Sequence, residues 1–126
     1  MSIVDAVLSV WSSCEAMTIL GGRNVEDLLD ERDEEAFEVP WLLAWERVKR
    51  ASGSSRPKGL ASDEEQRLFR SLYDQGLGGE LVEHVAEDLN LIAAAERWGL
   101  TDDAWIDALR RAYLAGHFPS RVDATR

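Results

Sequence analysis

Side chains that could carry out chemistry are concentrated in one segment, where four acidic residues surround a histidine: Glu80, Glu83, His84, Glu87 and Asp88. Residues four apart on a helix share a face, so His84 and Asp88 could form an acid–base pair. Together with Glu80, these two side chains could instead hold a metal ion. The spacing therefore allows a carboxylate-based enzyme or metal protein centred on Glu80, His84 and Asp88.

The apolar residues of the same segment favour a different interpretation. They recur at helical spacing and mark the side of the helix that we expect to be buried, namely Leu81, Val85, Leu89 and Ile92. The charged residues then fall mostly on the opposite, solvated side. The segment also lacks the second histidine of the H-E-x-x-H zinc motif. We predict a non-enzymatic protein without catalytic residues, metal or cofactor, and keep the enzyme or metal protein as an alternative.

Two other side chains with reactive potential have simple structural interpretations. Cys14 is the only cysteine and lies in an apolar helical stretch, which is typical of a buried, inert thiol. His117 follows Gly116 at the end of a predicted helix, where a cationic side chain interacts favourably with the helix dipole. Neither residue has the neighbours that a nucleophilic site requires.

Helical periodicity accounts for most of the chain, and no alternating pattern typical of a strand is found. The predicted helices begin directly after Ser2, Asn24, Ser62 and Thr101, at Pro40, and near Glu80. We therefore predict an all-α fold, a single-domain bundle or irregular array of about six helices over residues 1–126. Within it we expect an internal loop at 51–59 and a frayed tail at 119–126. No apolar run approaches the roughly 18 residues of a membrane span, and the N-terminus lacks a basic region, so we expect a cytoplasmic protein.

Charge is distributed unevenly along the chain, whose net charge is −10. Residues 26–38 contain eight acids and one base, Arg32, and we expect them to form mainly an exposed acidic connection. Residues 47–58 contain five bases and no acid. Trp41 and Trp45 lie between these two segments, four residues apart and therefore on one helix face.

This juxtaposition predicts a surface that binds another macromolecule. Acidic residues steer basic partners toward a surface, and tryptophan is enriched at binding hot spots. Core packing of the tryptophans and a merely solvated acidic segment are the plainer alternatives. We predict partner binding through Asp30, Glu31, Asp33, Glu34, Glu35, Trp41 and Trp45. The expected partner is a protein with a basic surface, whereas nucleic acid and anionic membranes should be repelled.

The general build is that of small acidic inhibitors, such as immunity proteins that neutralise a toxin and phage-encoded inhibitors of host defence. This comparison is a fold-level analogy, because no family motif supports it. Mimicry of nucleic acid by the carboxylates is a stronger version of the same hypothesis. The alternative is a regulatory or adaptor domain of helix-turn-helix type, which could form a homodimer. Its recognition helix would begin with Asp102 and Asp103, and these acids would repel phosphate.

Overall fold

The computed structural model describes residues 2–100 and 102–122, and these residues contain seven α-helices and no strand. The helices are α1 (Ile3–Trp11), α2 (Ala16–Ile19), α3 (Val25–Arg32), α4 (Glu35–Ser52), α5 (Ser62–Asp74), α6 (Gly79–Arg97) and α7 (Ala104–Leu114). The predicted all-α fold is confirmed. No helix of the described residues is long and apolar enough to cross a membrane.

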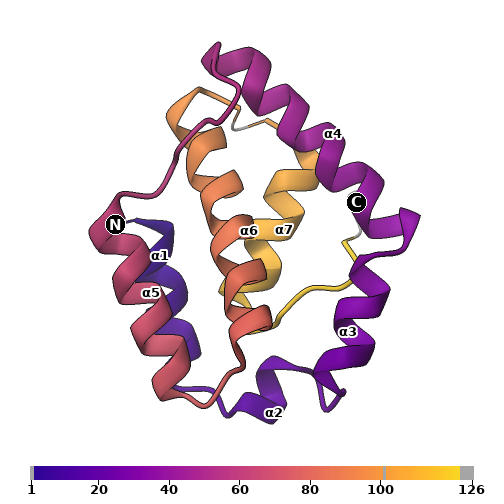
Figure 1. The fold of residues 1–126 in the computed structure, drawn as a ribbon, viewed down its shortest axis with the longest axis vertical. Coiled ribbons are helices and arrows are strands. Elements are labelled where there is room, and N and C mark those ends of the chain that lie inside the picture. The colour runs from indigo at the N-terminus through magenta and orange to yellow at the C-terminus, as the bar shows by residue number, and fades with distance from the viewer. Residues whose placement is uncertain (1, 101, 123–126) are drawn as a thin grey trace.

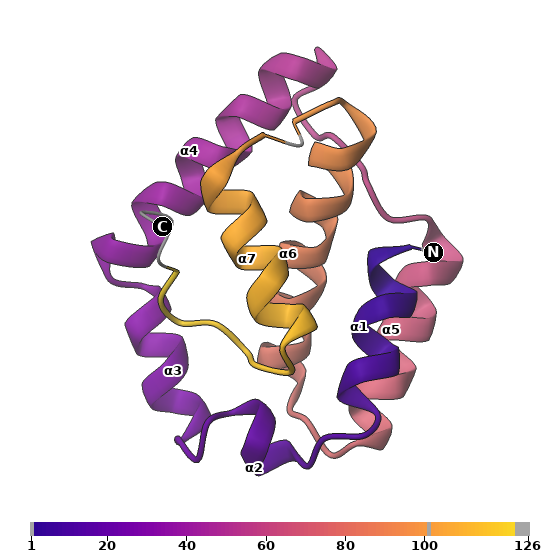
Figure 2. The ribbon, with the colours of Figure 1, turned by 180° about the vertical axis from the view of Figure 1, so that it is seen from behind.

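The antiparallel pair α6 and α7 occupies the middle of the molecule (Figure 1). Helices α1 and α5 lie on one side of this pair, and α3 and α4 lie on the other. Figure 2 shows the same arrangement from behind, with the segment after α7 crossing toward α3 and α4. The short helix α2 connects the two outer pairs at one end.

Helix α6 is buried on more than one face because helices cover it from both sides. Its buried residues include the predicted stripe but also Val82, Ala86, Asp88, Leu91, Ala94 and Ala95. A helix that is apolar around most of its circumference belongs in the centre of a fold. The predicted stripe is buried and Glu80, Glu83 and Glu87 are exposed, as expected, but the buried surface of α6 is wider than predicted and includes Asp88.

The first predicted helix is interrupted. The helix α1 ends at Trp11, and helical structure resumes only at Ala16, where α2 begins. In the interruption, the hydroxyls of Ser12 and Ser13 donate hydrogen bonds to backbone carbonyls three residues earlier, an alternative to continued helix. Met17, on the short helix after the interruption, is exposed.

Helix α4 begins at Glu35, five residues earlier than predicted, so that Pro40 lies inside the helix and not in its first turn. The acidic segment 26–38 is thus mostly helical, and only Asp33 and Glu34 separate α3 from α4. Helix α3 begins after Asn24, as predicted, with the Asn24 side chain accepting a hydrogen bond from the Glu26 backbone. Thr101, the predicted cap of the last helix, lies outside the described residues, and Asp103 caps α7 instead.

The predicted loop at 51–59 starts later, because α4 continues to Ser52, and its last part is held against α6. The Asn90 side-chain oxygen accepts hydrogen bonds from the backbone nitrogens of Gly59 (2.9 Å) and Leu60 (3.1 Å). Gly59 approaches α6 so closely that a β-carbon there would lie 2.2 Å from the backbone nitrogen of Ala94. Only glycine fits this crossing.

The segment after α7 is packed in its first part, contrary to the predicted frayed tail at 119–126. Phe118, Pro119 and Ser120 are buried, and the Phe118 backbone donates a hydrogen bond to the carbonyl of Ile19 (2.9 Å). Residues 123–126 lie outside the described residues. The segment just after α7 is part of the fold, because Pro119, Ser120 and Arg121 bond to side chains of α3.

Candidate functional site

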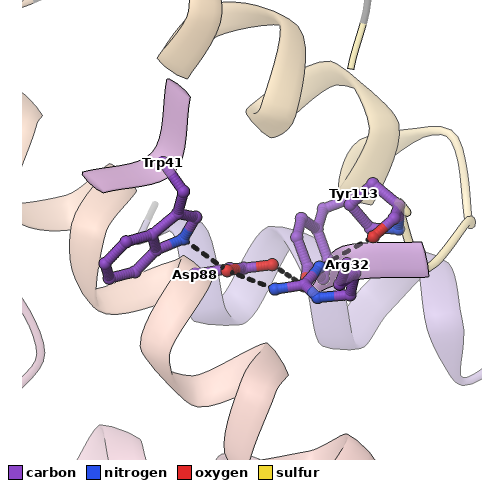
Figure 3. A network of polar contacts seen from close by, with 5 residues as sticks. Arg32, Trp41, Asp88 and Tyr113 are labelled. Atoms are coloured by element: carbon purple, nitrogen blue, oxygen red, sulfur yellow. Dashed lines mark hydrogen bonds and ion pairs between the residues drawn. The ribbon is translucent and has the colours of Figure 1, made fainter. Parts of the chain in front are cut away.

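A buried carboxylate joins four helices. Asp88 on α6 accepts hydrogen bonds from Arg32 on α3 (2.9 Å), from Trp41 on α4 (2.9 Å) and from the Tyr113 hydroxyl on α7 (2.6 Å). Figure 3 shows these side chains converging on Asp88 from different elements. Because each partner comes from a separate helix, this buried polar network fixes α3 and α4 relative to the central pair.

Arg32 is the cationic member of the network and is itself enclosed. It donates a second hydrogen bond to the carbonyl of Pro119 (2.7 Å), and its guanidinium lies 4.2 Å from the Phe37 ring centre and 4.7 Å from that of Phe118. Burial lowers the pKa of Arg32, but the charges and hydrogen bonds of Asp88 and Tyr113 together outweigh it, so that the pKa is raised. The single base of the acidic segment is therefore an internal residue.

Tyr113 completes the network from the other side. Burial, and then the negative charge of Asp88, raise the pKa of the Tyr113 hydroxyl well above its ordinary value, so that it remains a hydrogen-bond donor. Its ring stacks on Trp11 at 5.5 Å between ring centres, and the Trp11 indole donates to the Tyr113 carbonyl. Trp11 is fully buried.

The network removes the basis for the predicted Glu80, His84 and Asp88 centre. Asp88 faces the interior and is saturated by three donors, whereas Glu80 is exposed at the start of α6 and His84 is half-buried. Among the described residues, no three His, Cys, Asp or Glu side chains form a group that could hold a metal ion. Cys14 is half-buried, not buried, and its thiol lies 3.4 Å from the Val10 carbonyl.

Four of the five predicted acidic binding residues lie on the surface where α3 meets α4. Asp30, Asp33, Glu34 and Glu35 are exposed there and form no ion pair within the described part of the chain. We call these four residues the acidic face. Their charges are available to a partner.

Glu31 is placed differently from the acidic face. Its carboxylate pairs with Arg23 (2.8 Å) and Arg121 (2.7 Å) and accepts a hydrogen bond from Ser120 (2.9 Å). The hydrogen bond from Arg23, followed by those from Ser120 and Arg121, lowers the pKa of Glu31 to about 2. Glu31 thus attaches residues 120–121 to α3.

Trp41 and Trp45 share a face of α4, as predicted, and their rings stack at 5.9 Å between centres. Both are half-buried, so each combines packing against the core with an accessible edge. The Trp41 indole is bound to Asp88, whereas Trp45 has no hydrogen-bonded partner among the described residues. The stacked pair stands between two surface hollows.

The first hollow, which we call the α3–α6 hollow, has a volume of about 190 Å³ and lies between the α3–α4 junction and α6. Its apolar lining is Phe37, Trp41 and Leu42, and its carboxylates are Asp33, Glu38 and Glu87. Arg32 and His84 also line it. It therefore brings together part of the acidic face, one predicted tryptophan and the histidine of α6.

The second hollow lies on the other side of the tryptophan pair and has a volume of about 660 Å³. Trp45 and Phe69 form its aromatic lining, with Lys58 and Glu83 among its charged residues. Glu87 lines both hollows. The basic segment 47–58 thus reaches a surface that adjoins, but is distinct from, the acidic face.

An exposed apolar row on α4 was not predicted as a site. Val39, Leu42 and Leu43 are 47%, 49% and 55% exposed and lie next to the acidic face along the helix. The sequence did contain a sign of this row. Apolar residues occupy several faces of this helix, whereas a helix that is buried on one side needs only one apolar stripe. We call these three residues the α4 apolar row.

The helix-turn-helix alternative finds no support in the placement of α7. Its N-terminal cap Asp103 pairs with Arg47 of α4 (2.5 Å), and Trp105 and Ile106 in the following turn are buried. The end of the helix that would read base edges is therefore packed against α4.

Comparison with known proteins identifies the family. No curated protein and no solved structure matches the chain. A family model described as Immunity protein PIM1 matches residues 9–120 of the 126, a range that includes the buried network, the acidic face and the α4 apolar row. Immunity proteins bind and neutralise a cognate toxin protein and are typically non-enzymatic. The chain belongs to the Immunity protein PIM1 family.

Proposed function

We propose that this immunity protein neutralises its cognate toxin by covering a basic surface of it with the acidic face and the α4 apolar row. The observation that carries the proposal is their adjacency, because Glu35 and Val39 are one helical turn apart on α4. Unpaired carboxylates beside exposed leucines suit a protein surface that has both basic and apolar residues.

The two parts of this surface would act at different stages of binding. Exposed charges accelerate encounter with an oppositely charged partner and make association dependent on salt. Apolar side chains that lose water in the complex mainly slow dissociation. The half-buried Trp41 and Trp45 would add to the second effect, since partly exposed tryptophans are frequent hot spots.

The same adjacency favours recognition of a protein over mimicry of nucleic acid. A surface that imitated phosphates would need carboxylates alone, whereas the α4 apolar row would meet no counterpart in a phosphate-binding groove. With a net charge of −10, direct binding to nucleic acid is also disfavoured.

A charge-reversal experiment tests the proposal. The triple variant Asp30→Lys, Glu34→Lys, Glu35→Lys should associate with the cognate toxin about tenfold more slowly, or slower still, and with a weaker salt dependence. The control is Glu15→Lys, Asp74→Lys, Glu80→Lys, which makes the same change in net charge at exposed positions just before α2, at the end of α5 and at the start of α6. Stopped-flow association rates at several salt concentrations provide the measurement.

The two variants separate local from global electrostatics. A clearly larger effect at the acidic face than at the control positions would support the proposal. Equal effects would mean that only net charge matters, and no effect in either variant would remove the acidic face from the mechanism. Thermal melts of both variants establish that the comparison is between folded proteins.

A further inference from the structure

We propose that the α3–α6 hollow receives one arginine side chain of the toxin. This inference rests on the proposed function and specifies the chemistry of one contact within it. It concerns Glu38, Glu87 and Trp41, and none of the residues reversed in the preceding experiment lines this hollow.

The size of the hollow suits a single side chain. Sites for drug-sized molecules occupy about 300–1,000 Å³, and the α3–α6 hollow has about 190 Å³. It is open at the protein surface, on the side where Asp33 and Glu38 are exposed. A residue projecting from a docked protein could therefore enter it without any movement of the backbone.

The charge of the hollow selects a cation. Asp33, Glu38 and Glu87 are exposed carboxylates that have no ion-pair partner among the described residues. The positive charge of Arg32 is already compensated by Asp88. Three carboxylates thus remain around the hollow, and an entering cation would supply the missing counter-charge.

The apolar lining favours arginine over lysine. A guanidinium is planar, is less strongly hydrated than an ammonium, stacks on aromatic rings and binds carboxylates with two parallel hydrogen bonds. Trp41 provides the aromatic surface here, and Leu42 can contact the aliphatic part of the side chain. The Phe37 ring, which is buried, is already covered by the guanidinium of Arg32.

The hollow is held in shape before any partner arrives. The Trp41 ring is fixed on one side by its hydrogen bond to Asp88 and is stacked against Trp45. Phe37 is buried and packs edge-on against Trp105 of α7, with ring centres 5.7 Å apart. Rigid walls reduce the ordering entropy that binding would otherwise cost.

A matched pair of small probes tests the chemistry of the hollow. The first probe is the blocked tripeptide acetyl-Gly-Arg-Gly-amide, and its control replaces arginine by citrulline, which has nearly the same shape but no charge. In NMR titrations of the isotope-labelled protein, the arginine peptide should shift the Trp41 indole N–H and the Glu38 and Glu87 amides in a saturable manner. We expect it to bind about tenfold more tightly than the citrulline peptide.

Three results would overturn the inference. They are an absence of saturable shifts at these positions, equal affinity for arginine and citrulline peptides, and tighter binding of the corresponding lysine peptide. A Trp41→Phe variant assigns the indole signal among the five tryptophans.

The complex itself provides a second readout. The variant Glu38→Gln, Glu87→Gln keeps the shape of the hollow while removing two charges, and it should raise the dissociation rate of the toxin about tenfold or more. The control Glu15→Gln, Glu80→Gln removes two charges elsewhere. An unchanged dissociation rate in Glu38→Gln, Glu87→Gln would overturn the inference about the hollow. If charge reversal of the acidic face still slows association in that case, the proposed function is retained without the arginine contact. If both experiments show no effect, the proposed function fails as well.

Discussion

The guanidinium of Arg32 and the carboxylate of Asp88 form an ion pair of 2.9 Å in the interior, with side chains 4% and 0% exposed. Fifty-six residues separate the two in sequence. Transferring both charges from water costs free energy, and the attraction between them repays that cost only while both are present. The pair therefore makes the positions of α3 and α6 depend on each other.

Replacing Asp88 by Ala should destabilise the protein by about 3–5 kcal/mol, because Arg32 would remain buried without its counter-charge. The neighbouring variant Glu87→Ala, at an exposed position, should change stability by at most about 0.5 kcal/mol. Urea denaturation followed by circular dichroism measures both. Similar unfolding midpoints for the two variants would contradict the structural role assigned to Asp88.

The two stacked tryptophans should respond unequally to replacement by phenylalanine. Trp41→Phe removes the indole donor to the charged Asp88, a hydrogen bond worth about 1.5–3 kcal/mol. Trp45→Phe removes no hydrogen bond to the described residues and should cost less. Thermal denaturation of both variants checks the order, and a larger loss for Trp45→Phe would show that ring packing outweighs the bond to Asp88.

Glu31 should make stability depend on acidic pH. Its pKa is lowered from 4.5 to about 2 in the folded protein. A lowered pKa means that the stabilising contribution is complete above about 4.5 and is lost as the pH falls toward 2. In Glu31→Gln, the free energy of unfolding should decline less steeply over this interval than in the unaltered protein. Glu26→Gln, an exposed change in the same helix, is the control and should keep the original slope.

Gly59→Ala should destabilise the protein by about 1–3 kcal/mol, the usual range for overpacking. The added carbon would lie 2.2 Å from the backbone nitrogen of Ala94, and a helix backbone cannot move aside easily. Gly78→Ala is a matched control, because a β-carbon at Gly78 meets no atom within 4 Å and its φ of −74° is ordinary for alanine. Equal melting temperatures for the two variants would exclude a tight crossing of residues 57–60 over α6.

The helices could be predicted because each depends on local signals. Apolar residues at helical spacing, Asn24 as a cap and glycine after a helix act within a few residues of one another. The position of α4 was missed because Pro40 suits a first helical turn, and the acidic residues before it resemble a solvated connection. In the structure, Phe37 lies among these acidic residues and is buried, and its packing accounts for the helical conformation of the segment before Pro40.

The buried network could not be predicted from local pattern. Asp88 stands among charged residues on α6, and only the covering of that side by α4 and residues 118–120 makes it internal. Such long-range contacts leave no periodic signal in either segment. Arg32 was the one available clue, as the single base in the acidic segment 26–38. The adjacency of the acidic residues and tryptophans, in contrast, followed directly from their closeness along the chain.

The hydrogen bond between Trp41 and Asp88 has a consequence for how such a protein could acquire a new partner. Trp41 both lines the α3–α6 hollow and bonds to the buried Asp88. A substitution at Trp41 that altered the binding of a partner would therefore also lower the stability of the fold. The acidic face and the α4 apolar row carry no comparable constraint, since their side chains are exposed and form no hydrogen bond or ion pair with the buried network in the described part of the chain. Divergence of specificity in this scaffold should therefore proceed through residues such as Asp30, Leu42 and Leu43, while Trp41 and Asp88 stay fixed. On α4, the constrained Trp41 thus lies directly beside Leu42 and Leu43, which are free to change.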